Sequence, residues 1–196
     1  MDSKIAAQLE AIFGEDFFSF FYVPYVNERI HTLQEVMGVN WYLPIFDGDY
    51  WPEKHPLNFP GPLYTGETDN CGTGRPEAPF NVLYDNDGRE YVYRQPANYT
   101  ELLGVLTAAG IDPFDGYAGN GNDHWTYDAC KTWWRNRGDV IVALQDGELR
   151  ALNEGHEQAY IDYLRSGAAE TDLRRYCYFL EHYQYPTNEQ VALPDL

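Results

Sequence analysis

The segment 67–80 reads ETDNCGTGRPEAPF and places a thiol in a loop between glycines. A thiol nucleophile needs a base to activate it and a third group to orient that base. For Cys71 the candidate base is His124, which lies later in the chain and has Asp123 and Asp128 near it in sequence. Thiol hydrolases have their cysteine, histidine and acid in this general order. If the protein is an enzyme, the catalytic set we expect is therefore Cys71, His124 and Asp123.

The same loop also fits a purely structural role. Prolines follow Cys71 closely, so no helix N-terminus is expected to lower the pKa of its thiol, and nearby carboxylates would raise that pKa. Arg75 could hold an anion, or it could pair with Glu67 or Glu77, and the acidic surroundings favour the ion pair. We therefore predict that the long segment 47–80 is ordered and that its polar side chains satisfy its own backbone amides.

Metal and phosphate sites have weaker sequence support. No histidine stands three or four residues from another, and there is no Cys-x-x-Cys pair, so a zinc site is not predicted. The oxygen-rich stretches 47–49 and 112–123 lack the spacing of a calcium loop and are typical of turns. The glycines of 71–76 lack the lysine and the strand–helix context of a phosphate-binding loop. We expect no metal and no cofactor.

Aromatic residues make up 16% of the chain. Adjacent residues on an α-helix point about 100° apart, so Trp133 and Trp134 cannot both face the core. Exposed tryptophan and tyrosine side chains are typical of protein interfaces and of platforms that stack on sugars. The side chains that we expect to form a binding surface are Trp51, Tyr64, Asp69, Arg75, Trp125 and Trp134.

The chain has a formal net charge of −18. Residues 1–98 carry 6 basic and 15 acidic side chains, and residues 99–196 carry 7 and 16, so each half has a net charge of −9. An acidic surface of this extent repels nucleic-acid phosphates and anionic lipids and attracts basic proteins. We expect a basic protein as partner, and neither nucleic acid nor a membrane.

The cysteines and the chain start bear on the compartment. Cys71, Cys130 and Cys177 are odd in number and far apart, which is not the pattern of a disulfide framework, so three free thiols are predicted. The sequence shows no secretory leader pattern and no apolar run of about 18 residues. The expected location is the cytoplasm.

Hydrophobic periodicity predicts a single α+β domain over 1–196. Its clearest signal is a hairpin, NVLY-DNDG-REYVYR, over 81–94, in a small antiparallel sheet packed with N- and C-terminal helices. The aromatic run 17–25 is interpreted as a strand or an extended crossing segment, and 39–46 as a strand. For 140–152 a hairpin and a helix remain open. The predicted helices cover 3–13, 27–37, 99–109, a segment around 125–134, 153–165 and a last helix capped by Thr171.

Three classes of function are compatible with these patterns. The favoured one is an acidic protein-binding module, such as an immunity protein or an inhibitor of a basic toxin or nuclease, since charge complementarity gives fast capture of basic targets. The second is a hydrolase that uses Cys71 and His124. The third is a carbohydrate or small-ligand module built on tryptophan and tyrosine platforms with carboxylates.

Overall fold

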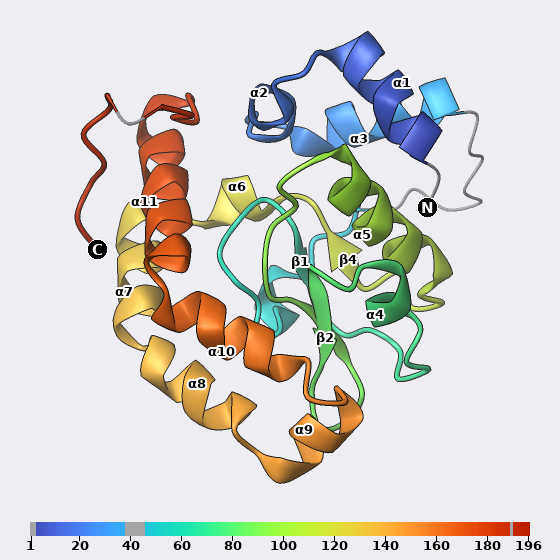
Figure 1. Ribbon diagram of the computed structural model, residues 1–196, viewed down its shortest axis with the longest axis vertical. Coiled ribbons are helices and arrows are strands. Elements are labelled where there is room, and N and C mark those ends of the chain that lie inside the picture. Colours follow the sequence, from blue (N-terminus) through green and yellow to red (C-terminus); the bar gives the residue numbers. More distant parts are fainter. Residues whose placement is uncertain (1–2, 38–45, 189) are drawn as a thin grey trace.

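The computed structural model describes residues 3–37, 46–188 and 190–196. It is mostly helical, with two small antiparallel sheets, which confirms the predicted α+β class. In Figure 1 the N-terminal helices lie on one side of the molecule, the helices from α7 to α11 on the other, and the β2–β3 hairpin between them. Within the described part of the chain, no helix is both long and apolar enough to span a membrane.

Three helices form the N-terminal part: α1 (Ser3–Phe13), α2 (Phe17–Phe21) and α3 (Val26–Met37). The expectation of a strand or extended segment over 17–25 is wrong, because five of these residues form α2. The Asp16 side chain accepts hydrogen bonds from the backbone amide and the hydroxyl of Ser19, which caps this short helix. Phe17, Phe20 and Phe21 then share a face and are buried in the core.

Asn27, the first residue of the predicted 27–37 helix, does not cap α3. It lies inside the helix, and its side-chain amide donates a hydrogen bond of 2.9 Å to the carbonyl of Phe46. The predicted strand over 39–46 falls outside the described residues except for Phe46, which forms an isolated bridge to Ala118.

The predicted hairpin is confirmed. Strands β2 (Val82–Tyr84) and β3 (Glu90–Val92) pair antiparallel, with Leu83 opposite Tyr91. Gly88 has a φ of 84°, a conformation that glycine adopts without strain, and it closes the turn. A second two-stranded sheet joins β1 (Tyr64–Thr65) to β4 (Tyr117–Ala118).

The segment 47–80 contains η1 (Trp51–Glu53), β1 and α4 (Gly74–Glu77). Its centre is Asn58, which is fully buried. The amide nitrogen of Asn58 donates to the carbonyls of His55 and Thr65, at 3.0 and 2.8 Å. Its oxygen accepts from the backbone amides of Thr65 and Val92 and from the Thr65 hydroxyl. The Asn58 side chain thus joins this segment to β3. It supplies hydrogen bonds that a loop does not obtain from a neighbouring strand.

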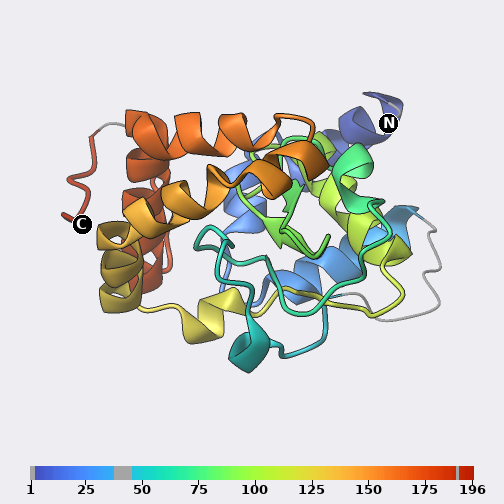
Figure 2. The ribbon, with the colours of Figure 1, turned by 90° about the horizontal axis from the view of Figure 1, so that it is seen from below.

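The remaining helices follow one another closely along the chain. Figure 2 shows α9 and α10 on one side of the hairpin and the η1 segment on the other. The helices are α5 (Tyr99–Ile111), α6 (Gly121–His124), α7 (Tyr127–Arg135), α8 (Arg137–Leu144), α9 (Gly147–Leu152), α10 (Glu157–Arg165) and α11 (Gly167–His182).

Several predicted helix boundaries need correction. The open region 140–152 is helical, because Asp146 caps α9 by accepting from the amides of Glu148 and Leu149. The helix expected from residue 153 begins at Glu157, because Asn153 uses its side chain to exchange hydrogen bonds with the backbone of Tyr84 in β2.

The last helix also starts earlier than predicted. Ser166 caps α11, and Thr171 lies inside the helix with its hydroxyl bonded to the Gly167 carbonyl. The segment after α11 is held more firmly than its prolines suggested, since Tyr185 is buried and its ring stacks on Tyr22 at 3.8 Å.

The thiols behave as predicted. All three cysteines are free, and Cys130 on α7 and Cys177 on α11 are fully buried in the core that these two helices share. Cys71, in contrast, is exposed.

Candidate functional site

Cys71 is placed where its thiolate is disfavoured. Its backbone amide donates to the Asp69 carboxylate at 3.0 Å. A hydrogen bond and the charge of that carboxylate raise the pKa of the Cys71 thiol above its ordinary value. A cysteine nucleophile needs a lowered pKa, so this electrostatic environment works against catalysis.

His124 has other partners than the predicted ones. Its Nε2 atom lies 3.0 Å from a carboxylate oxygen of Asp49 and 3.2 Å from the amide nitrogen of Asn120, and its ring stacks on Trp51 at 4.8 Å. Asp49, not Asp123, is therefore the acid beside the imidazole. Across the described ranges no hydrogen bond or ring contact joins Cys71 to His124.

The other polar groups of the 67–80 segment serve its own backbone. Asp69 and Asp112 are buried, and the Asp112 carboxylate accepts from the amides of Asp69, Phe114 and Gly116. The Asp69 carboxylate, which accepts from the Cys71 amide, agrees with the expectation that side chains of the loop satisfy its own backbone, whereas Asp112 lies outside the loop. The Arg75 guanidinium does form an ion pair, but with Glu154, at 2.8 Å, and not with Glu67 or Glu77. Both Asp69 and Arg75 thus have partners within the protein.

Beneath this loop lies Glu90, a carboxylate that is almost completely buried. It accepts hydrogen bonds from the Gly74 amide and the Tyr117 hydroxyl. A Cβ atom at Gly74 would lie 2.3 Å from a Glu90 oxygen, so a larger residue there would displace the carboxylate. Burial, together with the negative charges of Asp112 and Asp69, raises the pKa of Glu90 to about 7 against the hydrogen bonds that lower it.

Glu90 should make stability fall as pH rises. The folded protein holds this proton more tightly than the unfolded chain, whose carboxyl has a pKa of 4.5. The stabilisation is therefore complete below pH 4.5 and is lost as pH rises to about 7.

We expect the Glu90→Gln variant to gain up to about 3 kcal/mol of unfolding free energy relative to wild type between pH 4.5 and 8. Urea titrations at both pH values measure this change, with exposed Glu148→Gln as the control. A difference between Glu90→Gln and wild type that does not vary with pH would contradict the assignment.

A groove of about 480 Å³, here called the acidic groove, lies where α6, α7 and α11 meet the 22–25 loop. Three carboxylates line it, and within the described ranges none of them takes part in an ion pair. Two exposed tyrosines, Tyr25 at 65% and Tyr183 at 69%, stand beside them. The polar and aromatic lining residues are Tyr25, Asn122, Asp123, Trp125, Thr126, Tyr127, Asp128, Phe179, Glu181 and Tyr183.

The walls of the acidic groove are fixed by Asn122 and by a strained tyrosine. The Asn122 amide donates to the Val23 carbonyl at 2.8 Å, and its oxygen accepts from the Tyr176 hydroxyl at 2.9 Å. Tyr183 ends α11 in the left-handed conformation, with a φ of 54°. A bulky side chain in that conformation costs about 1–3 kcal/mol, and such residues cluster at functional sites. This conformation places the Tyr183 side chain in the lining of the groove.

A second hollow of about 720 Å³, here called the tryptophan cavity, adjoins the acidic groove and shares Trp125 and Asp128 with it. The Lys54 ammonium lies over two of its rings, 5.2 Å from the centre of Trp51 and 4.9 Å from that of Trp125. The residues around it are Trp51, Lys54, Pro56, Leu57, Trp125, Asp128, Ala129, Thr132, Trp133, Asn136, Asp139, Val140 and Ala143.

The structure thus brings together Trp51 and Trp125 of the predicted binding set. Tyr64 packs with its ring perpendicular to that of Trp51, and its hydroxyl donates a hydrogen bond to the Asn120 side chain. Trp134 is buried elsewhere and carries the Arg137 guanidinium on its face at 4.1 Å.

The two adjacent tryptophans on α7 differ in their place relative to the tryptophan cavity. Trp133, and not Trp134, lines the cavity. Lys54 was missed, although it is one of three lysines in a very acidic chain. The small number of lysines was the signal in the sequence that could have identified Lys54.

The described residues contain no cluster of three or more His, Cys, Asp or Glu side chains that could hold a metal ion. Comparisons with protein families, curated proteins and solved structures found no match to this chain.

Proposed function

We propose that this protein binds a basic protein through the acidic groove, as an inhibitor or an immunity-type partner of a toxin or nuclease. The observation that carries the proposal is the set of three unpaired carboxylates, Asp123, Asp128 and Glu181, beside two exposed tyrosines. Such carboxylates are complementary to lysine and arginine side chains of a partner.

Charge affects this interaction both at long range and in direct contact. The net charge of −18 raises the rate at which a positively charged protein encounters the surface. Inside the groove, the carboxylates of Asp123, Asp128 and Glu181 line one hollow and offer direct partners to basic side chains. Lys131 reaches the Tyr127 hydroxyl at 3.4 Å, so one wall of the groove already carries a cation. The basic segment is expected to approach from the Tyr25 and Tyr183 side.

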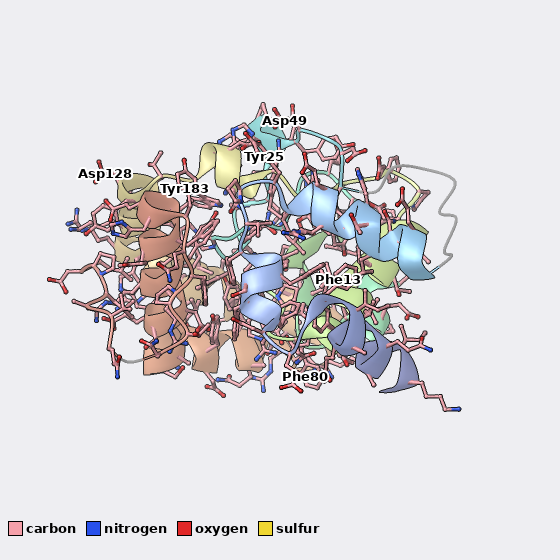
Figure 3. All side chains as sticks on the ribbon, turned by 90° about the horizontal axis from the view of Figure 1, so that it is seen from above. Phe13, Tyr25, Asp49, Phe80, Asp128 and Tyr183 are labelled. Atoms are coloured by element: carbon pink, nitrogen blue, oxygen red, sulfur yellow. The ribbon has the colours of Figure 1, made fainter. Side chains whose placement is uncertain are left out.

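Aromatic side chains supply the contacts that hold a partner after the encounter. Figure 3 shows Tyr25, Tyr183, Asp128 and Asp49 along one edge of the molecule, whereas Phe13 and Phe80 lie away from it. Tyrosine faces attract lysine and arginine side chains, and tyrosines are frequent among the residues that dominate binding energy at interfaces. An acidic edge with exposed tyrosines therefore suits a long-lived complex with a basic surface.

A nuclease is a natural class of target for such a surface. The substrate of a nuclease is a polyanion, so its active site is basic, and an acidic protein can compete for the same surface. We place this activity in the cytoplasm, a proposal that the three free thiols support, because thiols persist in a reducing compartment.

The partner and its docking site can be found in one experiment. A carbodiimide joins carboxylates to amines that touch them, and mass spectrometry locates the joined residues in complexes formed in the source cells. The proposal expects a basic partner whose lysines are joined to Asp123, Asp128 or Glu181. Cross-links found only at other carboxylates, or an acidic partner, would contradict it. Cys71→Ala should give the same cross-links as wild type, whereas a hydrolase would lose turnover in that variant.

A further inference from the structure

Lys54 is the basic side chain of the tryptophan cavity. Within the described ranges it takes part in no ion pair and no hydrogen bond, although the chain has many more acidic than basic residues. Its contacts are the faces of Trp51 and Trp125. Burial lowers the pKa of this ammonium group, as expected where a cation has lost water without gaining a counter-ion.

The space next to Lys54 has the size and the lining of a ligand site. Cavities that hold small molecules measure roughly 300–1,000 Å³ and are lined mainly by apolar and aromatic side chains with a few polar groups. The tryptophan cavity has about 720 Å³, and 8 of its 13 lining residues are apolar or aromatic, among them three tryptophans. We propose that it binds a small amphipathic anion, with a flat apolar body against the indoles and a carboxylate or similar group on the Lys54 ammonium.

The two carboxylates at the cavity do not reverse its preference for an anion. Asp128 and Asp139 are exposed at its rim, where water screens them. Lys54 is largely withdrawn from water, so its interaction with an anion is stronger at the same distance. The two carboxylates exclude anions that lack an apolar body, and the indoles select those that have one.

This site is separate in chemistry from the acidic groove, although the two share a wall. A basic protein is attracted to unpaired carboxylates, whereas the ligand proposed here is attracted to an unpaired ammonium. Loss of one interaction therefore does not imply loss of the other.

Three probes of nearly equal shape and different charge test the proposal: 1-naphthaleneacetate, its neutral amide, and 2-(1-naphthyl)ethylamine as the cation. Their affinities are measured by calorimetry. We expect the acetate to bind wild type at least about tenfold more tightly than the amide, because only the acetate carries a negative charge to pair with the Lys54 ammonium, and hydrogen bonds between two ionised groups are stronger than those to a neutral one. In Lys54→Met, which keeps the apolar stem, the acetate and the amide should bind equally well.

Two further variants separate charge from folding. Lys54→Arg keeps the positive charge and should keep the preference for the acetate. Lys131→Met removes the ammonium that lies 5.3 Å from the centre of the Tyr127 ring, outside the cavity, and should leave all three affinities unchanged. The proposal is wrong if the amide binds wild type as tightly as the acetate, if the amine binds most tightly, or if no probe binds saturably at millimolar concentration.

Discussion

Asn58→Ala is expected to lower the free energy of unfolding by about 4 kcal/mol or more. The side chain is fully buried and makes five hydrogen bonds, so its removal strands donors and acceptors of the 55–65 segment and of Val92. Each buried polar group left without a partner costs about 1–3 kcal/mol, and water cannot reach all of them. Urea unfolding measured by tryptophan fluorescence gives the loss directly.

Asn86→Ala is the matched control for this prediction. Asn86 is exposed in the turn of the hairpin, and its replacement should change stability by no more than about 0.5 kcal/mol. If Asn58→Ala loses less than 1 kcal/mol, the 55–65 backbone must have other partners, and the account of this segment is wrong.

Neutralising the acidic groove should slow the capture of a basic partner by about tenfold at 0.1 M salt, because electrostatic steering changes association rates by roughly 10- to 1,000-fold. The variant combines Asp123→Asn, Asp128→Asn and Glu181→Gln. Asp123 and Asp128 stand in the first turns of α6 and α7, so a small loss of stability is also expected. Stopped-flow mixing with the partner identified by cross-linking measures the association rate constant.

A second triple variant controls for net charge. Glu15→Gln, Glu35→Gln and Glu148→Gln remove the same number of charges from exposed positions outside the groove. This variant should associate with the partner at nearly the wild-type rate. Equal slowing in both triple variants would show that overall charge, and not the groove, selects the partner.

The parts of the fold that sequence predicted well have strong local signals. The turn residues DNDG between two β-rich runs suffice for the hairpin, and regular spacing of apolar residues suffices for α1 and α5. Helix α2 was not predicted, because five residues are too few for a periodic pattern. Asp16, three residues before Ser19, was nevertheless a usable capping signal. For α9, Asp146-Gly147 fits both a hairpin turn and a helix start, and tertiary packing decides between them.

The candidate site was predictable in composition but not in arrangement. Tryptophans and acidic residues were expected at the surface, and Trp51 and Trp125 do line the same cavity. Tyr25 and Tyr183 line the same groove because Asn122 of α6 links the loop before α3 to α11, through its hydrogen bonds with the Val23 carbonyl and the Tyr176 hydroxyl. Likewise, the partner of Arg75 stands 79 residues further along the chain. Contacts of this kind leave no local pattern in a sequence.

The salt dependence of association tests the proposed function most directly. The Debye length falls from about 10 Å at 0.1 M salt to about 3 Å at 1 M, which screens charges at a distance but affects buried contacts less. The association rate constant of wild type with its partner should therefore fall steeply over this range, while the dissociation rate constant, governed by the groove tyrosines, should change little. An association rate that stays constant from 0.1 to 1 M salt would contradict the proposal that the acidic groove captures a basic protein.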